Sequence, residues 1–256
     1  MGCEPHARGR PTRRRRLPRE ARRVARGLRV SSIVVQVAMD EEAQPFLDAA
    51  AQVSDPVTIG RAVHRGVVVG NATFVLVVSG IGMVNAADAV AGSVFRYGSE
   101  IALVSAGSAG GLASDARVGD VVVGTDIVNV EADARAFGYA LGQVPGMPAN
   151  YQADEALAAA FEGERVTRAA MASGEKFVTA GIAHELRENF PGSWSVDMET
   201  AAIAQAAYNH GVRFAACRAI SDLCAPDSEE FDTHLDGAAE RSAEVVLAAL
   251  PRLAAA

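Results

Sequence analysis

Lysine and cysteine are both scarce in this chain of 256 residues. Lys176 is the one lysine among 24 basic residues, and there are three cysteines. An odd number of cysteines without a C-x-x-C pair argues against a disulfide framework and a zinc ribbon, and it predicts a reducing, cytoplasmic location. The five histidines show no H-E-x-x-H or comparable ligand spacing. The sequence therefore predicts no metal site.

The charge is divided unevenly along the chain. Residues 1–29 contain eleven arginines against two glutamates, whereas residues 30–256 carry 13 basic and 29 acidic side chains. The acidic body argues against nucleic acid as a partner, and no apolar run approaches the ~18 residues of a membrane span. The basic head lacks aromatic residues for base stacking and the apolar segment of a secretion signal. We expect residues 1–29 to be a disordered extension or to precede the true translation start; a functional basic tail is the alternative.

Apolar runs alternate with amphipathic stretches over the rest of the chain. Strands are predicted at residues 32–38, 63–69, 73–79, 101–106, 118–130, 166–173, 194–196 and 212–220. Helices are predicted at residues 40–51, 83–97, 154–161, 182–189, over a stretch that ends at 211, and at about 231–250. This alternation predicts an α/β protein of a single domain, in which a mixed, twisted central β-sheet is covered by helices on both faces.

Small and turn-forming residues predict finer features. Asp40 is in position to cap the first helix. We expect residues 107–111 to form a turn, and the strand that follows them to bend at Gly119 and Gly124. Residues 131–150 form a loop rich in glycine, proline and aromatic residues, and a loop of that length is usually a functional or interface element.

Polar or glycine-rich segments follow five of the predicted strands. They lie at residues 39–42, 79–82, 107–111, 174–177 and 221–222. Ligands of open α/β folds bind beyond the carboxyl ends of the strands, so these five segments can converge on one site. Packing alone does not require polar residues at so many strand ends.

Two carboxylates near these segments suit the cleavage of an N-glycosidic bond. Glu199 stands at the mouth of a predicted helix, and Asp222 follows the last predicted strand. One carboxylate can hold a sugar diol while the other donates a proton to the leaving base. Asp222 also suits the plain structural role of a helix cap, which is the alternative interpretation. The pair predicts a nucleoside-cleaving enzyme.

Seven motifs occur in order over residues of about 30–250: AMDEE, SGIG, AGSAGG, AFGY followed by GQVPG, SGEKFV, VDMETAA and RAISD. This set resembles the methylthioadenosine/S-adenosylhomocysteine nucleosidases, which have the nucleoside phosphorylase-like fold. The resemblance implies that residues 30–256 form a nucleosidase domain that acts as a homodimer. It implies hydrolysis of the adenine–ribose bond of methylthioadenosine and S-adenosylhomocysteine, with 5′-deoxyadenosine as a further candidate, through an oxocarbenium-like transition state without metal or cofactor.

The resemblance also implies a role for the motif residues. Asp222 donates the proton to N7 of adenine, Glu42 activates the attacking water, and Glu199 accepts hydrogen bonds from the ribose diol. The other implied binding residues are Met198 under the ribose, Phe177 and Val178 at adenine, Ser108 and Gly110 near the water, Ser221 beside the acid, and Met39, Ile81 and Phe231 around the 5′-substituent. Phe137, Tyr139 and Pro145 of the 131–150 loop are implied to reach the neighbouring subunit's 5′ pocket. Met198 and Phe177 equally suit an ordinary hydrophobic core.

Two positions depart from the family pattern. Val130 stands where the family commonly has histidine, and Asp197 stands where it commonly has the longer glutamate. An aminodeoxyfutalosine nucleosidase, a phosphorylase and a non-catalytic nucleoside-binding module are the alternatives. The acids at residues 40–42 would repel a phosphate dianion, which favours water as the nucleophile. The presence of three carboxylates suited to catalysis favours an enzyme over a binding module.

Overall fold

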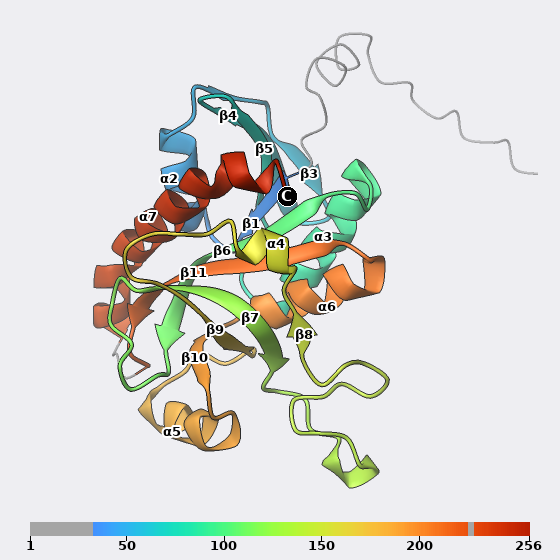
Figure 1. Ribbon diagram of the computed structural model, residues 1–256, viewed down its shortest axis with the longest axis vertical. Helices are drawn as coiled ribbons and strands as arrows, with labels where there is room; N and C mark the ends of the chain where they lie inside the picture. Colours follow the sequence, from blue (N-terminus) through green and yellow to red (C-terminus); the bar gives the residue numbers. More distant parts are fainter. Residues whose placement is uncertain (1–32, 225–227) are drawn as a thin grey trace, which may run out of the picture. The chain divides into compact units, whose positions relative to one another are not determined.

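The computed structural model describes residues 33–224 and 228–256, of which 228–234 as backbone only, and these residues fall in one unit of the chain. The expectation for residues 1–29 lies outside the described part. An eleven-stranded mixed sheet has the order β10-β9-β7-β11-β6-β1-β5-β4-β2, with β3 on β4 and β8 on β7 (Figure 1). The strands are β1 (Ile33–Val37), β2 (Gln52–Val53), β3 (Val57–Ile59), β4 (Ala62–Val69), β5 (Ala72–Val78), β6 (Ala102–Gly111), β7 (Val121–Asn129), β8 (Tyr151–Gln152), β9 (Val166–Ser173), β10 (Ser193–Asp197) and β11 (Arg213–Asp222).

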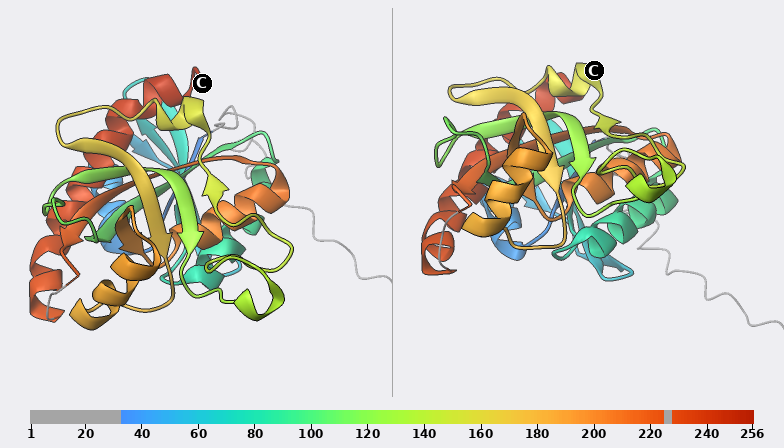
Figure 2. Two further views of the ribbon diagram at one scale, coloured as in Figure 1. Left: turned by 60° about the horizontal axis from the view of Figure 1, so that its bottom comes forward. Right: turned by 90° about the horizontal axis from the view of Figure 1, so that it is seen from below.

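Helices cover both faces of this sheet, which confirms the predicted fold class. They are α2 (Asp40–Asp48), α3 (Met83–Tyr97), the single-turn η1 (Arg135–Phe137), α4 (Glu155–Ala158), α5 (Ala180–Asn189), α6 (Thr200–His210) and α7 (Ser228–Leu253). Helices α2 and α7 lie on one side of the strands, and α3 and α6 lie on the other (Figures 1 and 2). None of the helices described here has the length and apolar composition that crossing a bilayer requires.

The two hydrophobic cores follow from the alternation of side chains along each strand. In β1, Val35 and Val37 point into the core that contains Phe46 of α2, whereas Val34 points into the core that contains Val90 of α3. Successive strand residues face opposite sides of a sheet, so a strand with helices on both faces is apolar at most positions. This explains why the central strands read as continuous hydrophobic runs. A polar residue there needs an internal partner, as Gln36 finds in the Ala86 carbonyl at 3.0 Å.

Part of the sheet closes on itself. Strand β10 runs parallel to β9 and also pairs antiparallel with β6 at Gly110 and Gly111. Strands β6, β11, β7, β9 and β10 therefore form a ring. The ring brings Asp197, at the end of β10, to the carboxyl-terminal half of β6 and β11.

The turn predicted at residues 107–111 is wrong, because β6 continues through all five residues. Strand β11 pairs alongside it, with Gly107 opposite Arg218 and Ala109 opposite Ile220. The small residues do not reverse the chain; they allow neighbouring groups to approach the β6 backbone closely. A Cβ on Gly107 would lie 2.3 Å from the Oε1 atom of Glu42, so the glycine makes room for that carboxylate.

Several helix and strand boundaries also differ from the prediction. The N-cap of α2 is Met39, not Asp40, because Glu42 in the first turn accepts the Met39 N–H at 3.3 Å. The helix predicted at 154–161 is reduced to the four residues of α4, and the edge strands β2, β3 and β8 were not predicted. The bend expected at Gly124 is present as a register shift between Gly124 and Ile127.

Candidate active site

A cavity of about 150 Å³ opens at the carboxyl ends of the central strands. Eleven of the residues singled out in the sequence line it: Met39, Glu42, Ile81, Ser108, Gly110, Phe177, Val178, Met198, Glu199, Ser221 and Asp222. They come from the ends of β1, β5, β6, β9, β10 and β11, or from the segments that follow them. The strand ends thus converge on one cavity.

Glu42 is held by four hydrogen-bond donors. It lies in the first turn of α2 with 1% of its surface exposed. Its Oε2 accepts the N–H groups of Ala38 at 2.8 Å and Met39 at 3.3 Å. Its Oε1 accepts the N–H of Ser108 at 2.8 Å and the hydroxyl of Ser108 at 3.0 Å. Two carboxylate oxygens accept about four hydrogen bonds, so the orientation of Glu42 is fully determined.

Glu199 is buried beside Arg218, just ahead of α6. Its Oε1 accepts the N–H of Gly82 at 2.8 Å, and its Oε2 lies 3.3 Å from Nη1 of Arg218. Burial raises the pKa of Glu199 from its ordinary 4.5 to about 7, while the charge of Arg218 acts in the opposite direction. A buried carboxylate with its pKa near neutrality is typical of a functional site.

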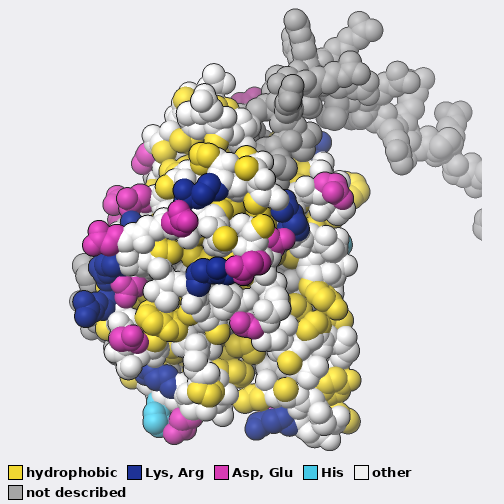
Figure 3. All heavy atoms as spheres, viewed as in Figure 1, with side chains coloured by type: hydrophobic (Ala, Val, Ile, Leu, Met, Phe, Trp, Pro, Cys, Tyr) yellow, Lys and Arg dark blue, Asp and Glu magenta, His cyan; other side chains and the backbone are white. Residues whose placement is uncertain are grey.

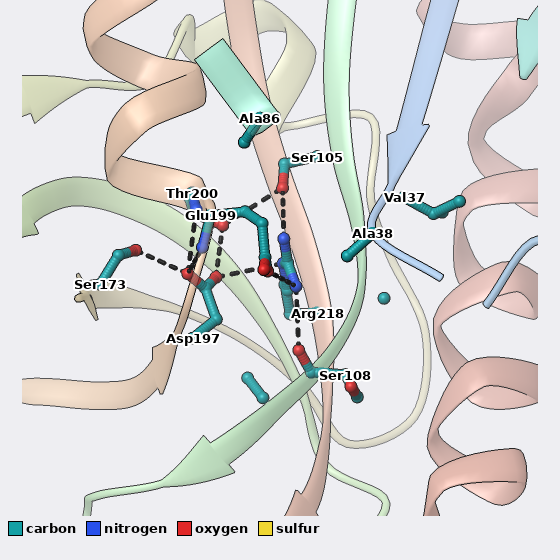
Figure 4. A network of polar contacts seen from close by, with 12 residues as sticks. Val37, Ala38, Ala86, Ser105, Ser108, Ser173, Asp197, Glu199, Thr200 and Arg218 are labelled. Carbon is teal, nitrogen blue, oxygen red and sulfur yellow. Dashed lines mark hydrogen bonds and ion pairs between the residues drawn. The ribbon is translucent and has the colours of Figure 1, made fainter. Parts of the chain in front are cut away.

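Arg218 and Asp197 form the base of the site, and the sequence analysis assigned a role to neither. Arg218 is 1% exposed in the middle of an apolar strand, a position where an unpaired charge would be very costly. Its Nε lies 3.1 Å from Asp197, its Nη1 donates to the Ser108 carbonyl at 3.1 Å, and its Nη2 donates to Ser105 at 3.0 Å (Figure 4). An arginine within the run RFAACRAI was the signal that could have revealed it.

Asp197 collects donors from two strands, β9 and β11, and from the start of α6. Its Oδ1 accepts the hydroxyl of Ser173 at 2.6 Å and the N–H groups of Glu199 and Thr200 at 3.0 and 2.9 Å. Its Oδ2 accepts the hydroxyl of Thr200 and pairs with Arg218 (Figure 4). The short Asp197 side chain thereby accepts backbone N–H groups at the N-terminus of α6. It positions Glu199 in two ways, by accepting the Glu199 N–H and by pairing with Arg218, which also contacts Glu199.

Asp222 is the last residue of β11 and lies against a glycine of β6. Its Oδ1 accepts the N–H of Cys224 at 2.8 Å, and its Oδ2 lies 2.8 Å from the hydroxyl of Ser221. Cys224 has a left-handed backbone with φ of 57°, which is unusual for a residue other than glycine. A Cβ on Gly110 would lie 2.6 Å from Sγ of Cys224 and 3.3 Å from Oδ1 of Asp222. Only glycine leaves room here for the acid and its support.

The Cys224 side chain lines the cavity without contributing an ionisable group at neutral pH. Burial, helped by the charge of Asp222, raises the pKa of its thiol to about 12. The thiol is free and buried, and so is that of Cys217. Cys224 therefore acts as a small neutral side chain beside the acid.

Apolar side chains form the rim of the cavity. Ile81 follows β5 and is 49% exposed, and Phe177 follows β9 and is 45% exposed. Lys176 also reaches the rim and pairs with Glu131 at 3.5 Å. An apolar rim over buried carboxylates suits a ligand with a flat ring and a polar sugar.

Three of the residues singled out do not line this cavity, and the side chain of a fourth is not described. Phe137, Tyr139 and Pro145 belong to the 131–150 loop, where Phe137 is 84% exposed at the end of η1. Hydrophobic side chains gather over β8 and this loop at one edge of the molecule (Figure 3). Phe231 lies in α7, and its side chain falls outside the described residues.

The chemistry available here is that of carboxylates. No group of three or more His, Cys, Asp and Glu side chains within residues 33–224 and 228–256 could hold a metal ion. The cavity combines two carboxylates held by hydrogen bonds, Glu42 and Asp222, with a third carboxylate beside an arginine, Glu199. Such a set can protonate a leaving group, orient a nucleophile and stabilise a cationic centre between them.

Comparison with known proteins relates the cavity to a family. Residues 32–251 match the model of the phosphorylase superfamily. The chain is 37% identical over 224 residues to the 5′-methylthioadenosine/S-adenosylhomocysteine nucleosidase of Anoxybacillus flavithermus. The aligned region covers 84% of this chain and 96% of that protein.

Solved structures give the same relation. A nucleosidase of that name from Neisseria meningitidis, in complex with methylthio-immucillin-A, has a TM-score of 0.79 and 36% identity over 86% of this chain and 98% of that one. The futalosine hydrolase of Helicobacter pylori has a TM-score of 0.80 and 26% identity over 87% of this chain and 98% of that one.

Proposed function

Since the chain belongs to the phosphorylase superfamily, we propose that it hydrolyses the N-glycosidic bond of 5′-methylthioadenosine and S-adenosylhomocysteine and releases adenine. The observation that carries the proposal is the convergence of Glu42, Glu199 and Asp222 on one cavity whose rim includes Phe177. Relatives that share 36–37% of their residues with this chain bear the name of that activity. 5′-Deoxyadenosine is a further candidate substrate.

Asp222 is the proposed proton donor. Adenine leaves readily only when N7 is protonated, so the reaction needs a carboxylic acid at that atom. Ser221 has one hydroxyl hydrogen and two acceptors, the Ala109 carbonyl at 3.3 Å and Oδ2 of Asp222 at 2.8 Å. When that hydrogen is directed at Ala109, the Ser221 oxygen can itself accept a hydrogen bond from Asp222. Ser221 can therefore hold the Asp222 carboxyl in place both before and after the proton is transferred.

Glu199 and Glu42 serve the sugar in this proposal. Ionised Glu199 accepts hydrogen bonds from the ribose diol and stabilises the positive charge that develops on the ring as adenine leaves. Glu42, held by the N–H groups of Ala38, Met39 and Ser108, orients a water and takes its proton as the water attacks C1′. The Ser108 hydroxyl can rotate away from Oε1 and leave a lone pair of that oxygen for the water. Phe177 stacks on adenine, the Val178 backbone reads its edge, and Met198 packs under the ribose.

Water is the proposed nucleophile instead of phosphate. Among the residues that the structure describes, Arg218 is the arginine that lines the cavity, and its guanidinium is engaged by Asp197, Glu199 and Ser108. A phosphate dianion would meet Glu42 and Glu199 without a free guanidinium to compensate.

The 5′-substituent pocket is proposed to be completed by a second copy of the chain. Met39, Ile81 and Phe231 would supply one side, and Phe137, Tyr139 and Pro145 of the partner the other. The exposure of Phe137 and of Phe95 on α3, at 84% and 90%, supports burial in a dimer. The free thiols of Cys217 and Cys224 support a reducing, cytoplasmic compartment. Residues 30–256 are the proposed nucleosidase domain, with residues 1–29 an extension to it.

Aminodeoxyfutalosine is the second candidate substrate. The similarity to the futalosine hydrolase of Helicobacter pylori, at 26% identity, favours keeping it. The same carboxylates would perform the chemistry, and the 5′ pocket would decide between the substrates.

Adenine release, followed by chromatography with and without phosphate, tests the proposal on methylthioadenosine, S-adenosylhomocysteine and aminodeoxyfutalosine. We expect adenine and the free thioribose product without phosphate. Strict dependence on phosphate would identify a phosphorylase, and no release from any of the three by the folded protein would favour a binding module.

A further inference from the structure

The N-terminus of α3 is held by two carboxylates from different strand ends. Glu199 accepts the N–H of Gly82 at 2.8 Å, and Glu175 accepts the N–H of Met83 at 3.0 Å. The first hydrogen bond is buried, whereas the second is exposed and joins residues 92 positions apart in the sequence. The first amides of a helix have no intrahelical acceptor, so two carboxylates there satisfy two donors and interact favourably with the helix dipole.

The absence of a side chain at Gly82 makes room for the Glu175 carboxylate. A Cβ on Gly82 would lie 2.9 Å from Oε2 of Glu175, and Gly82 has a φ of +99°, which side chains rarely adopt. The carboxylate therefore lies directly against the glycine backbone while its other oxygen accepts the Met83 N–H. The contact depends on the absence of a side chain at this position.

The two segments joined by Glu175 both contribute to the cavity rim. Ile81 stands just before Gly82 on one segment, and Phe177 stands just after Glu175 on the other; both line the cavity. In the proposed function one segment borders the sugar and its 5′ carbon, and the other borders adenine. The Glu175–Met83 hydrogen bond thus joins two segments that contribute residues to the rim.

We propose that Glu175 is a positioning residue that fastens the segment of residues 174–178 to the N-terminus of α3 and so closes the rim over a bound nucleoside. This inference rests on the proposed function for the identity of the ligand. Glu175 touches neither the leaving group nor the water, so its contribution is the same in the ground state and the transition state. Uniform contributions of that kind change KM and leave kcat unaltered.

A graded pair of variants tests the proposal. Glu175→Ala removes the acceptor, whereas Glu175→Gln keeps a neutral amide oxygen that accepts the Met83 N–H more weakly. We expect KM for methylthioadenosine to rise about 3- to 10-fold in Glu175→Ala and by less in Glu175→Gln, with kcat within about twofold of wild type. Glu100→Ala, which removes an exposed carboxylate in the turn before β6, is the matched control and should leave both constants unchanged.

Amide hydrogen exchange at Met83 supplies a readout that does not depend on turnover. The Met83 amide should exchange faster in Glu175→Ala than in wild type, with an unchanged melting temperature. Wild-type KM and unchanged Met83 exchange in Glu175→Ala would overturn the proposal, and so would a fall in kcat at constant KM. Failure of the wild-type protein to release adenine would instead count against the proposed function, while the exchange measurement would still decide whether Glu175 fastens the rim.

Discussion

The three carboxylates Glu42, Glu199 and Asp222, which we call the wall of the cavity, and the 131–150 loop were assigned to the same site from the sequence. The two regions differ in burial and in hydrogen bonding. Glu42, Glu199 and Asp222 are at most 5% exposed, and each is held by hydrogen bonds within one chain. Phe137 is 84% exposed and lies outside the cavity. The carboxylates of the wall are buried within a single chain, whereas Phe137 of the loop is left exposed.

This difference separates the chemistry from the choice of substrate. Groups that must donate or accept a proton need a fixed geometry, and fixed geometry comes from packed strands and buried hydrogen bonds. A pocket for the 5′-substituent needs only apolar surface, which a second chain can supply. We therefore expect substitutions in the wall to cost far more activity than substitutions in the loop.

The largest effect is expected at the proton donor. Asp222→Asn keeps the shape of the side chain but cannot donate an acidic proton, so kcat for methylthioadenosine should fall about 10²- to 10⁴-fold with folding intact. Steady-state adenine release and the melting temperature are the measurements. Asp115→Asn, at an exposed position, is the control. Turnover near the wild-type rate would remove Asp222 from the acid role and leave it as a cap of the segment that follows.

Arg218→Met should produce the largest loss of stability. The substitution leaves Asp197 and Glu199 buried without their cation, and breaking such a pair typically costs about 3–5 kcal/mol. Chemical denaturation gives the free energy of unfolding, and the exposed Arg213 of the same strand provides the control Arg213→Met. Equal stability of the two variants would show that the buried ion pairs do not support the wall.

The pH dependence of kcat/KM should report the ionisation of Glu199. Its pKa is about 7, and the diol requires the ionised form, so kcat/KM should fall about tenfold per pH unit below that value. Glu199→Gln should have a lower kcat/KM that lacks this acidic limb, that is, the fall in kcat/KM below about pH 7. A limb that persists in Glu199→Gln would assign the titration to another group.

The same pKa affects stability. Because the pKa of Glu199 in the folded state lies above the ordinary 4.5, its contribution to stability is present below pH 4.5 and is lost as the pH rises through about 7.

The smallest effect is expected in the loop. Phe137→Ala should raise KM for methylthioadenosine about 3- to 10-fold and leave kcat nearly unchanged, because the side chain would only cover the 5′-methylthio group. Sedimentation should show a dimer in the wild type. A loss of kcat as large as that of Asp222→Asn would break the distinction between wall and loop.

The sequence predicted no strand order, but it placed the ends of β1, β5, β9 and β11 to within two residues. Hydrophobic runs revealed β1, β5, β6, β9 and β11, and a carboxylate or glycine at a strand end marks a ligand site in this type of sheet. It did not reveal that residues 107–111 remain in the sheet, because glycine favours both a turn and a close approach of two strands. Pairing with β11 and β10 decides between them, and pairing is a long-range property.

Arg218 and Asp197 show the same limit inside the site. Each stands in one of the motifs, RAISD and VDMETAA, but the roles that the resemblance implied there belong to Asp222 and Glu199. Their role depends on β10 closing onto β6, which brings the end of β10 beside β11. A charged residue within an apolar strand is a signal that can be read from sequence, whereas its partner is not.

A substrate whose leaving group needs no proton tests the role of Asp222 most directly. The 4-nitrophenyl glycoside of 5-methylthioribose releases a stable phenolate, so hydrolysis of this compound by Asp222→Asn should proceed within about tenfold of the wild-type rate. The same variant should remain about 10²- to 10⁴-fold impaired on methylthioadenosine, and Glu42→Gln should be impaired on both. An equal loss on both substrates in Asp222→Asn would contradict protonation of adenine by Asp222.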